Sequence, residues 1–448
     1  MAIHKFFLND KYILMDVNGG SIHIVDELTY RMVDHCEDKS LQQVYALFPE
    51  DAPELVAEIY GELQDLKEQG YLYTPDIKQE QIRYNPGNVI KALCLHVAHD
   101  CDLRCKYCFA SQGDYGGQRR LMSLETGKTA LDFLVAHSGN RRNLEVDFFG
   151  GEPLLNFEVV KELTLYGEEL NRQYDKNIRF TITTNGVSLD EDKIDFINEH
   201  MVNVVMSLDG RKEINDEMRP TVNGKGSYDL VVKNFKRLIE KRGDKEHYIR
   251  GTFTANNLDF MQDAMDYYDQ GFRKISIEPV VTDPKEPYAL REEHLERILQ
   301  EYEDFSRAYM EINRGEDKML FFHFRIDLAE GPCLAKRSVG CGAGSEYIAV
   351  TYSGEIYPCH QFVGDERFKI GDLWEGITDL DLRDSFKGTN VFTKEECSSC
   401  WAKFYCSGGC HANAFYNNGT ILRPYQLGCE MEKKRLECAI SILANEEV

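Results

Sequence analysis

The sequence contains no run of about 18 apolar residues, the length that a membrane-spanning helix requires. Its first residues, MAIHKFFLNDKY, also lack the basic segment and the long apolar segment of a secretory signal peptide. We therefore expect a cytoplasmic protein with no membrane partner. Thiols stay reduced in that compartment, so the 14 cysteines are not expected to form disulfides. Their clustered spacing indicates metal binding instead.

An excess of basic charge is also missing. The chain has 52 Lys and Arg residues against 76 Asp and Glu, a net charge of -24. Binding to nucleic acid requires concentrated positive charge, because the phosphates must be neutralised. The composition therefore argues against a nucleic-acid partner.

The length of 448 residues predicts two or three domains, because single hydrophobic cores stop growing below this size. Residues 1–80 form the first predicted domain. The segments HKFFL, YILMD and SIHIV are typical of three short strands. A helix from Asp26 through Met32 and another over residues 53–69 follow them. This order predicts a winged-helix-like unit.

From Lys91 onward, strands and helices alternate, and residues 81–315 form the second predicted domain. Six β-α units of this kind build a parallel sheet with right-handed crossovers, and we expect an α/β fold that curls into a partial (β/α)6 barrel. A doubly wound open sheet is the alternative. The strands are predicted near residues 91–97, 144–149, 178–183, 203–208, 247–254 and 273–279, with helical stretches such as 122–137, 156–172, 227–241 and 257–270.

A long helical stretch is predicted from about residue 290 to residue 313. The third predicted domain, residues 316–448, is rich in Gly and Cys and poor in regular periodicity. A segment of this composition is expected to depend on metal for its folding.

Three cysteines, Cys101, Cys105 and Cys108, are spaced C-x3-C-x2-C directly after the first predicted barrel strand. Three thiolates on a short loop can hold three irons of a cubic 4Fe-4S cluster and leave the fourth iron open. The alternatives are a zinc site or chance. Structural zinc prefers four protein ligands in paired spacings, and no fourth ligand follows nearby, although His99 and Asp100 precede the loop.

This loop, with the aromatic Tyr107 before its last cysteine, resembles the signature of the radical S-adenosylmethionine superfamily. Further motifs that resemble the family follow predicted strands, and the C-terminal rim of such barrels carries the active site. The resemblance implies that the open iron binds S-adenosylmethionine, with Cys101, Cys105 and Cys108 as the catalytic ligands. The motifs FFGGEP, TTNG, SLDG and ISIEPV, together with Tyr107, place the implied S-adenosylmethionine contacts at Tyr107, Gly150, Gly151, Glu152, Asn185, Ser207, Asp209 and Glu278.

The chemistry implied by this resemblance is radical chemistry. A reduced cluster donates one electron to the sulfonium, and the resulting 5′-deoxyadenosyl radical abstracts an unactivated hydrogen. In such enzymes the protein supplies placement and excludes water. An external one-electron reductant of the flavodoxin or ferredoxin type is the implied partner.

A second set of cysteines lies in the third predicted domain. Its spacing is C-x12-G-x4-C, a gap, C-x2-C-x5-C-x3-C, a gap and a last cysteine, and the glycine is Gly354. This resembles the SPASM extension, which carries two auxiliary 4Fe-4S clusters and so implies three clusters in all; zinc remains the alternative. By the family pattern, Cys397, Cys400, Cys406 and Cys429 hold one auxiliary cluster, and Cys341, Cys359 and Cys410 belong to the other.

Seven auxiliary cysteines leave one of eight irons without a ligand. Cys333 is the candidate eighth ligand, but it lies further before Cys341 than in related enzymes, and Gly331-Pro332 constrains its approach. We therefore expect that iron to be open to a substrate cysteine. His360 and His411 adjoin ligand cysteines and are expected to support them rather than bind metal. The remaining cysteines, Cys36, Cys94 and Cys438, are expected to be buried apolar residues.

The strand-strand-strand-helix order of residues 1–80 resembles the leader-peptide recognition domain of ribosomal peptide maturation enzymes. The resemblance implies that a leader peptide adds as a strand beside SIHIV, a general mode of peptide capture. A winged helix also suits DNA binding, but the acidic composition argues against that alternative.

The whole arrangement resembles the maturases of six-cysteine SCIFF peptides, within the sactipeptide class. It implies a thioether between a cysteine sulfur and the α-carbon of another residue in a Cys-rich precursor peptide. One alternative is an anaerobic sulfatase-maturing enzyme, which makes formylglycine. Those enzymes usually lack an 80-residue leader-binding unit and carry Asp where this chain has His360. A non-enzymatic alternative is an iron-sulfur electron carrier, which would not cleave S-adenosylmethionine.

Overall fold

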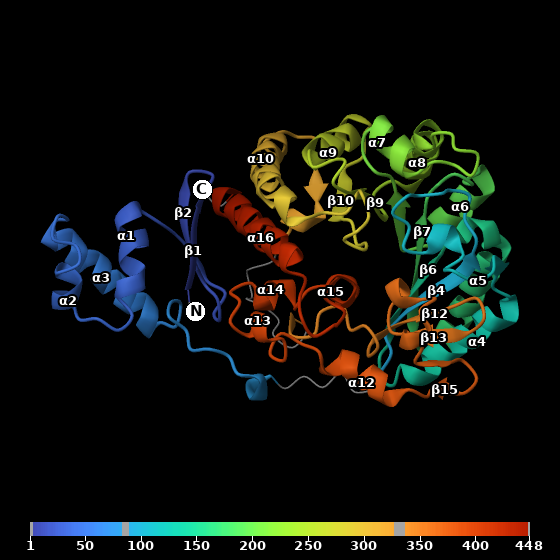
Figure 1. The fold of residues 1–448 in the computed structure, drawn as a ribbon, viewed down its shortest axis with the longest axis horizontal. Coiled ribbons are helices and arrows are strands. Elements are labelled where there is room, and N and C mark those ends of the chain that lie inside the picture. The colour runs from blue at the N-terminus through green and yellow to red at the C-terminus, as the bar shows by residue number, and fades with distance from the viewer. Residues whose placement is uncertain (1–2, 83–88, 327–336, 447–448) are drawn as a thin grey trace.

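The structure is a computed structural model that describes residues 3–82, 89–326 and 337–446. Figure 1 shows an N-terminal unit at one end, a sheet wrapped by helices at the other, and the C-terminal segment between them. Cys333 lies outside the described residues, as do Gly331 and Pro332.

The N-terminal unit is a three-stranded antiparallel sheet followed by short helices. The predicted strands are confirmed as β1 (Ile3–Leu8), β2 (Lys11–Asp16) and β3 (Ile22–Val25), in the order β1-β2-β3. Asp26 caps α1 (Glu27–Met32) by accepting a hydrogen bond from the Thr29 amide at 2.9 Å. The short α2 (Leu41–Tyr45) was not predicted, whereas α3 (Pro53–Glu68) matches the prediction over residues 53–69.

The two faces of this small sheet pack against different partners. Leu14 joins Met32, Val33 and residues of α3 in a separate core cluster. Phe6 and Ile13, on the other face, join the main hydrophobic core of the chain. That face lies against α16 (Gln426–Glu446), the last helix. The N-terminal unit is therefore docked on the rest of the chain (Figure 1).

The predicted α/β fold is confirmed by six parallel strands that neighbour one another in sequence order. They are β4 (Ala92–His99), β6 (Asn143–Gly150), β7 (Asn177–Thr184), β8 (Asn203–Ser207), β9 (Glu246–Phe253) and β10 (Lys274–Pro279). A doubly wound sheet reverses its strand order at a switch point. The order β10-β9-β8-β7-β6-β4 has no reversal, so the structure excludes that alternative.

The barrel does not close on itself. β10 pairs with the short β11 (Leu320–Phe321), and the other edge strand, β4, pairs in parallel with β12 (Tyr347–Val350). A two-residue strand, β5 (Arg120–Leu121), lies antiparallel to the end of β4. The sheet therefore continues into the predicted third domain through β13 (Glu355–Tyr357), β14 (Gly371–Asp372) and β15 (Gly376–Ile377).

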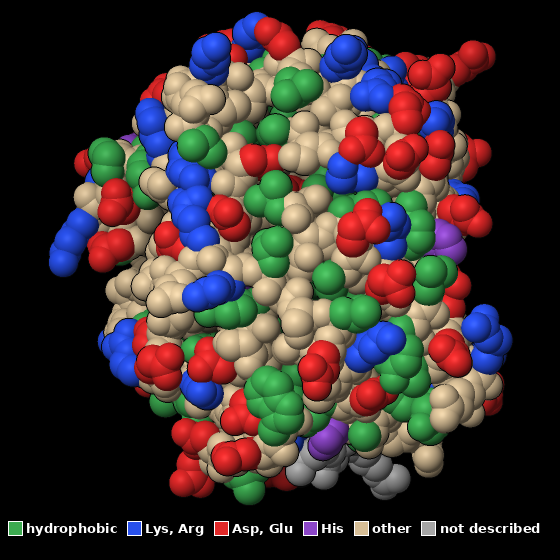
Figure 2. Space-filling model, turned by 90° about the vertical axis from the view of Figure 1, so that its right-hand side faces the viewer, with side chains coloured by type: hydrophobic (Ala, Val, Ile, Leu, Met, Phe, Trp, Pro, Cys, Tyr) green, Lys and Arg blue, Asp and Glu red, His purple; other side chains and the backbone are tan. Residues whose placement is uncertain are grey.

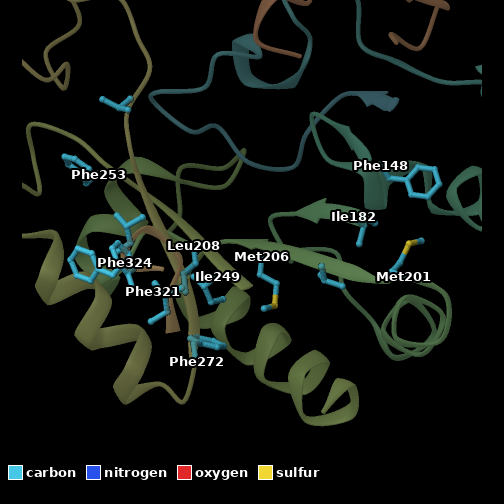
Figure 3. Close-up of a cluster of buried hydrophobic side chains, with 14 of the residues drawn as sticks. Phe148, Ile182, Met201, Met206, Leu208, Ile249, Phe253, Phe272, Phe321 and Phe324 are labelled. Atoms are coloured by element: carbon cyan, nitrogen blue, oxygen red, sulfur yellow. The ribbon is translucent and has the colours of Figure 1, made fainter. Parts of the chain in front are cut away.

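The connecting helices cover the outside of the sheet (Figure 1). They are α4 (Leu124–His137), α5 (Phe157–Tyr174), α6 (Glu191–His200), α7 (Lys212–Met218), α8 (Tyr228–Arg242), α9 (Phe260–Asp269) and α10 (Leu295–Asn313). The main core lies between these helices and the strands, and Figure 3 shows part of it, including Phe148, Ile182, Met206 and Ile249 from successive strands. These residues alternate with lumen-facing positions, as the twofold period of a strand requires.

The expectation of little regular structure after residue 316 is wrong for the end of the chain. α16 spans 21 residues, and the region also contains α12 (Leu380–Gly388), α13 (Glu395–Ser398), α14 (Lys403–Cys406) and α15 (His411–Asn418). α16 is buried along much of its length between α10 and the N-terminal sheet, so its apolar residues do not form a single amphipathic stripe.

Among the described residues, no helix combines the length and apolar character needed to cross a bilayer. Figure 2 shows acidic and basic side chains interspersed over the face of the molecule that lies at the right of Figure 1. Ion pairs also form within helices, such as that of Lys161 with Glu158 at 2.8 Å on α5.

Candidate active site

The C-x3-C-x2-C loop begins directly after β4 and is fixed to another part of the barrel rim. The Arg104 amide donates to the Pro220 carbonyl at 2.7 Å, and the Lys106 amide donates to the Met218 carbonyl at 2.9 Å. These bonds tie the loop to the segment that follows α7. The loop is therefore held in place by its backbone, and its three cysteines border a cavity.

The glycine pair of the FFGGEP motif brings the end of β6 against this loop. The Gly151 amide donates to the Ala98 carbonyl at 2.7 Å, and Glu152 donates to the Asp100 carbonyl at 2.8 Å. A Cβ at Gly150 or Gly151 would collide with these backbone atoms, and Gly150 has a φ of 125°. Only glycine permits so close an approach.

Glu152 is 1% exposed and is held by three donors. The Thr184 hydroxyl donates at 2.7 Å, the Asn185 amide at 2.8 Å and the Leu154 amide at 3.1 Å. Burial raises the pKa of Glu152 to about 8, and the charge of Asp102 adds to the effect. The carboxyl group is therefore positioned to gain from a cationic partner, which would favour its ionised form.

Asn185 links Glu152 to the cysteine loop. Its side-chain amide donates to Asp102 at 2.8 Å and lies 3.6 Å from the sulfur of Cys101. On the other side of the loop, the Tyr107 hydroxyl donates to Asp209, and Arg219 donates to the same hydroxyl at 2.9 Å.

Most of the predicted site residues border one cavity of about 360 Å³. They are Cys101, Cys105, Tyr107, Cys108, Gly150, Gly151, Glu152, Asn185 and Ser207. Asp209 is not among the bordering residues; it is 2% exposed and accepts the hydrogen bond of Tyr107, which does border the cavity. Glu278 does not line it: its carboxylate lies 3.1 Å from His323 and 4.0 Å from Arg435 of α16.

Sequence reasoning missed several residues that line the same cavity. β9 contributes Tyr248 and Arg250, which share a face with Thr252, and β6 contributes Asp147. Their twofold alternation within strands is the signal that would have placed them toward the lumen. Arg219 belongs to no motif, and nothing in the sequence would have found it.

Asp147 is a second carboxyl group that borders this cavity, besides Glu152. The Thr183 hydroxyl lies 3.1 Å and 3.2 Å from its two oxygens. Burial raises the pKa of Asp147 to about 7, although the hydrogen bond from Thr183 opposes the shift. The cavity therefore contains a carboxyl group that titrates near neutral pH.

His360, the residue that follows Cys359, also borders this cavity. Its ring lies 5.5 Å from Phe109, which follows Cys108, and 5.2 Å from Phe149. Its Nδ1 lies 2.7 Å from the Tyr347 hydroxyl and 3.8 Å from the Cys359 sulfur. Burial lowers the pKa of His360 to about 4, and the charge of Arg250 contributes.

The cysteines of the predicted auxiliary sites lie in two groups. Cys359 is close enough to Cys341 and Cys410 for their charges to raise its pKa, after the larger effect of burial. The other group borders a second cavity, of about 300 Å³, and consists of Cys397, Cys400, Cys406 and Cys429. Burial raises the pKa of both Cys406 and Cys429 to about 11. Without a metal these thiols are protonated at neutral pH.

The predicted buried cysteines are confirmed, because Cys36, Cys94 and Cys438 are at most 1% exposed. His411 is 6% exposed, and neither of its ring nitrogens has a hydrogen-bond partner among the described residues. Within residues 3–82, 89–326 and 337–446, no three His, Cys, Asp or Glu side chains converge on a site for a single metal ion. The ligands of a cubic cluster bind different irons and need not converge in this way.

The donors at the cysteine loop fit a 4Fe-4S cluster and S-adenosylmethionine. The three thiols are grouped on one loop beside a cavity. Burial raises the pKa of Cys105 to about 12, so this thiol is protonated without a metal and would lose its proton on binding iron. Gly113, with a φ of 103°, lies against Cys101 where a Cβ would meet the cysteine side chain at 2.7 Å. A residue other than glycine at this position would therefore displace Cys101.

Comparison with known proteins identifies relatives over most of the chain. The family model described as the radical SAM superfamily matches residues 95–267. An uncharacterised protein of Methanocaldococcus jannaschii, MJ0907, is 30% identical over 227 residues, covering 50% of this chain and 72% of that protein. A cysteine-type anaerobic sulfatase-maturating enzyme of Clostridium novyi is 29% identical over 367 residues, covering 77% of this chain and 93% of that enzyme.

A solved structure shares the fold over nearly the whole chain. SuiB of Streptococcus suis, in a crystal structure with its precursor peptide SuiA, has a TM-score of 0.54 at 17% identity. The match covers 95% of this chain and 98% of SuiB.

Proposed function

Because this chain belongs to the radical SAM superfamily, we propose that it modifies a Cys-rich precursor peptide by forming a thioether between a cysteine sulfur and the α-carbon of another residue. The cavity carries this proposal. It is bounded by the thiols of Cys101, Cys105 and Cys108 on one side and by His360, which follows Cys359, on another. A substrate bound there contacts both cysteine-rich regions.

In this proposal the loop cysteines hold the 4Fe-4S cluster that binds S-adenosylmethionine, and Glu152, Asn185 and Arg219 orient the bound cofactor. Reductive cleavage of S-adenosylmethionine supplies the radical that abstracts hydrogen from the peptide. Glu152 receives the cationic amino group, which favours its carboxylate form. Ser207 borders the same cavity, and Asp209 holds Tyr107 in place by accepting a hydrogen bond from its hydroxyl. The walls of the partial barrel would limit the access of water to the reacting carbon.

The auxiliary cysteines are proposed to bind two further 4Fe-4S clusters. Cys397, Cys400, Cys406 and Cys429 supply four thiols to one of them. Cys341, Cys359 and Cys410 supply three to the other, whose remaining iron is left for the substrate cysteine. The similarity to SuiB, crystallised with its precursor peptide, supports a peptide as the substrate.

The N-terminal unit is proposed to bind the leader of that peptide. β3 is an edge strand of the three-stranded sheet, and no other strand of the described residues pairs with its outer edge. Ile24 on this strand is 42% exposed. An edge with free amide and carbonyl groups is a template for one more strand.

Formylglycine formation is the second candidate, supported by the similarity to the C. novyi sulfatase-maturating enzyme. The two functions differ in what happens to sulfur. A thioether retains the sulfur and removes two hydrogens from the peptide, whereas formylglycine formation removes the sulfur of a cysteine. Mass spectrometry of Cys-rich and sulfatase-derived peptides after incubation with the reduced enzyme and S-adenosylmethionine distinguishes them. Loss of sulfur without a crosslink would contradict the thioether proposal.

A further inference from the structure

Lys394 is a buried lysine without an acidic partner in the described part of the chain. It is 1% exposed, and its ammonium group donates to the Gly408 carbonyl at 2.7 Å. No described carboxylate lies within ion-pairing distance of it, unlike Lys433, which lies 2.9 Å from Glu430. A buried ammonium is costly unless a negative charge compensates it. Its surroundings must therefore supply that charge in another form.

The position of Lys394 joins the two groups of auxiliary cysteines. Its backbone carbonyl accepts a hydrogen bond from the Cys397 amide at 3.1 Å. Its side chain reaches Gly408, which lies on the short link between Cys406 and Cys410. Cys397 and Cys406 belong to one group, and Cys410 belongs to the other. The ammonium group is thus attached to the link at which the two groups meet.

The structure places four cysteine sulfurs near this ammonium group. Burial lowers the pKa of Lys394, and the charges that oppose this effect are those of Cys397, Cys406, Cys410 and Cys429. His411, which also lies close to Lys394, supplies no negative charge, because an imidazole is either neutral or cationic. The cysteines become anionic when they bind metal, since coordination deprotonates a thiol.

We propose that the ammonium group of Lys394 is the shared counter-charge of the two auxiliary iron-sulfur clusters and raises the reduction potential of both. This inference rests on the proposed function, because each cysteine group must bind a cluster. A fixed positive charge stabilises the additional electron of a reduced cluster, and net charge and burial are among the factors that set cluster potentials. Lys394 would thereby favour acceptance of the electron that remains when a thioether forms.

The test is a redox titration of the full-length, anaerobically reconstituted protein, followed by electron paramagnetic resonance. Lys394→Met removes the charge and retains an unbranched side chain. At a fixed potential we expect the ratio of reduced to oxidised cluster to fall at least tenfold at both auxiliary sites, equivalent to about 59 mV for a one-electron couple. The cluster of the Cys101–Cys108 loop should keep its potential. Lys394→Arg retains the charge and should keep both auxiliary potentials.

Lys433→Met is the matched control, because the auxiliary cysteines on which the charge of Lys433 acts, Cys397, Cys400 and Cys429, belong to a single proposed cluster. It should change the potential of that cluster alone. Loss of the auxiliary clusters in Lys394→Met but not in Lys394→Arg would also support a requirement for the charge. Wild-type potentials in Lys394→Met, or an Arg variant that behaves like the Met variant, would overturn the inference. A wild-type chain with only about four irons would instead overturn the auxiliary clusters of the proposed function, and this inference with them.

Discussion

The imidazole of His4 stacks on the indole of Trp401, with ring centroids 3.7 Å apart and ring planes 4° from parallel. The same imidazole lies 3.0 Å from Glu437 of α16. Trp401 directly follows Cys400, so β1 touches the segment that carries one group of auxiliary cysteines. The proposed leader-binding unit and the proposed cluster-binding segment therefore share an interface.

We expect His4→Ala to weaken this interface by about 1 kcal/mol, because it removes the stacking contact and the contact with Glu437. Hydrogen exchange should then be faster in β1 and in the last turns of α16. His23→Ala is the matched control, since His23 contacts the Tyr71 carbonyl within the N-terminal unit at 3.1 Å. Equal exchange in both variants would show that the stacking does not hold the unit in place.

Leader binding can be tested at β3 without removing the N-terminal unit, whose deletion would expose the buried face of α16. The Asp16 amide donates to the Ser21 carbonyl at 2.9 Å, so Ser21 directs its backbone groups toward β2. Successive residues of a strand direct these groups to opposite edges, and Ile24, three residues later, therefore directs its amide away from β2. Ile24→Pro should therefore keep the sheet and block an added strand. We expect at least a tenfold loss of leader affinity, measured by calorimetry.

Phe7→Pro is the control for this experiment, because Phe7 is 54% exposed and lies on the opposite edge strand, β1. The same alternation directs its amide outward. Leader binding that is equally weak in both variants would indicate damage to the sheet, and unchanged binding in both would place leader recognition elsewhere.

The sequence predicted the strands of the barrel closely, because β6 and β7 alternate apolar and polar residues with a twofold period. It also predicted Glu152 and Asn185 as site residues through motifs at strand ends. It did not predict α16, because a helix buried on several sides has no single apolar stripe. It placed Glu278 among the S-adenosylmethionine contacts, whereas in the structure Glu278 pairs with His323 and Arg435, which are distant in sequence. Such long-range contacts leave no local pattern.

Substitution of the loop cysteines tests the radical site. Cys101→Ala, Cys105→Ala and Cys108→Ala should each abolish formation of 5′-deoxyadenosine and leave the auxiliary clusters in place, because this loop borders the cavity with Glu152. Chromatography of the products and iron analysis measure both outcomes. Cys36→Ala, in the buried core of the N-terminal unit, is the control. Undiminished 5′-deoxyadenosine from any loop variant would refute the assignment.

Asp147 predicts a pH dependence of stability. Its pKa in the folded protein is raised to about 7, whereas that of an unfolded Asp is about 3.9. The folded state therefore loses stability as the pH rises from about 4 to about 7, because the unfolded chain releases this proton in that range while the folded protein retains it. Asp147→Asn removes this cost.

We expect Asp147→Asn to stabilise the protein by on the order of 2 kcal/mol at pH 8, and by less at pH 5. Thermal unfolding at the two pH values measures the difference. Glu145→Gln is the control, because Glu145 lies two residues earlier on the same strand, at the surface, in an ion pair with Arg179. A gain at pH 5 as large as that at pH 8 would show that the carboxyl group of Asp147 does not titrate in this range.

The last prediction concerns the iron that the seven auxiliary cysteines leave without a ligand. If Cys341, Cys359 and Cys410 alone hold their cluster, its fourth iron is free to take the thiolate of the substrate cysteine, and iron coordination deprotonates that thiol without a separate base. His360 and the cavity beside Cys359 would then set the direction from which the peptide approaches. On this view Cys333→Ala retains roughly twelve irons, as three clusters of four, and still crosslinks its peptide. Iron analysis and mass spectrometry of the peptide test both points. Loss of one cluster's iron together with crosslinking, while 5′-deoxyadenosine still forms, would make Cys333 the eighth ligand and leave no iron for the substrate.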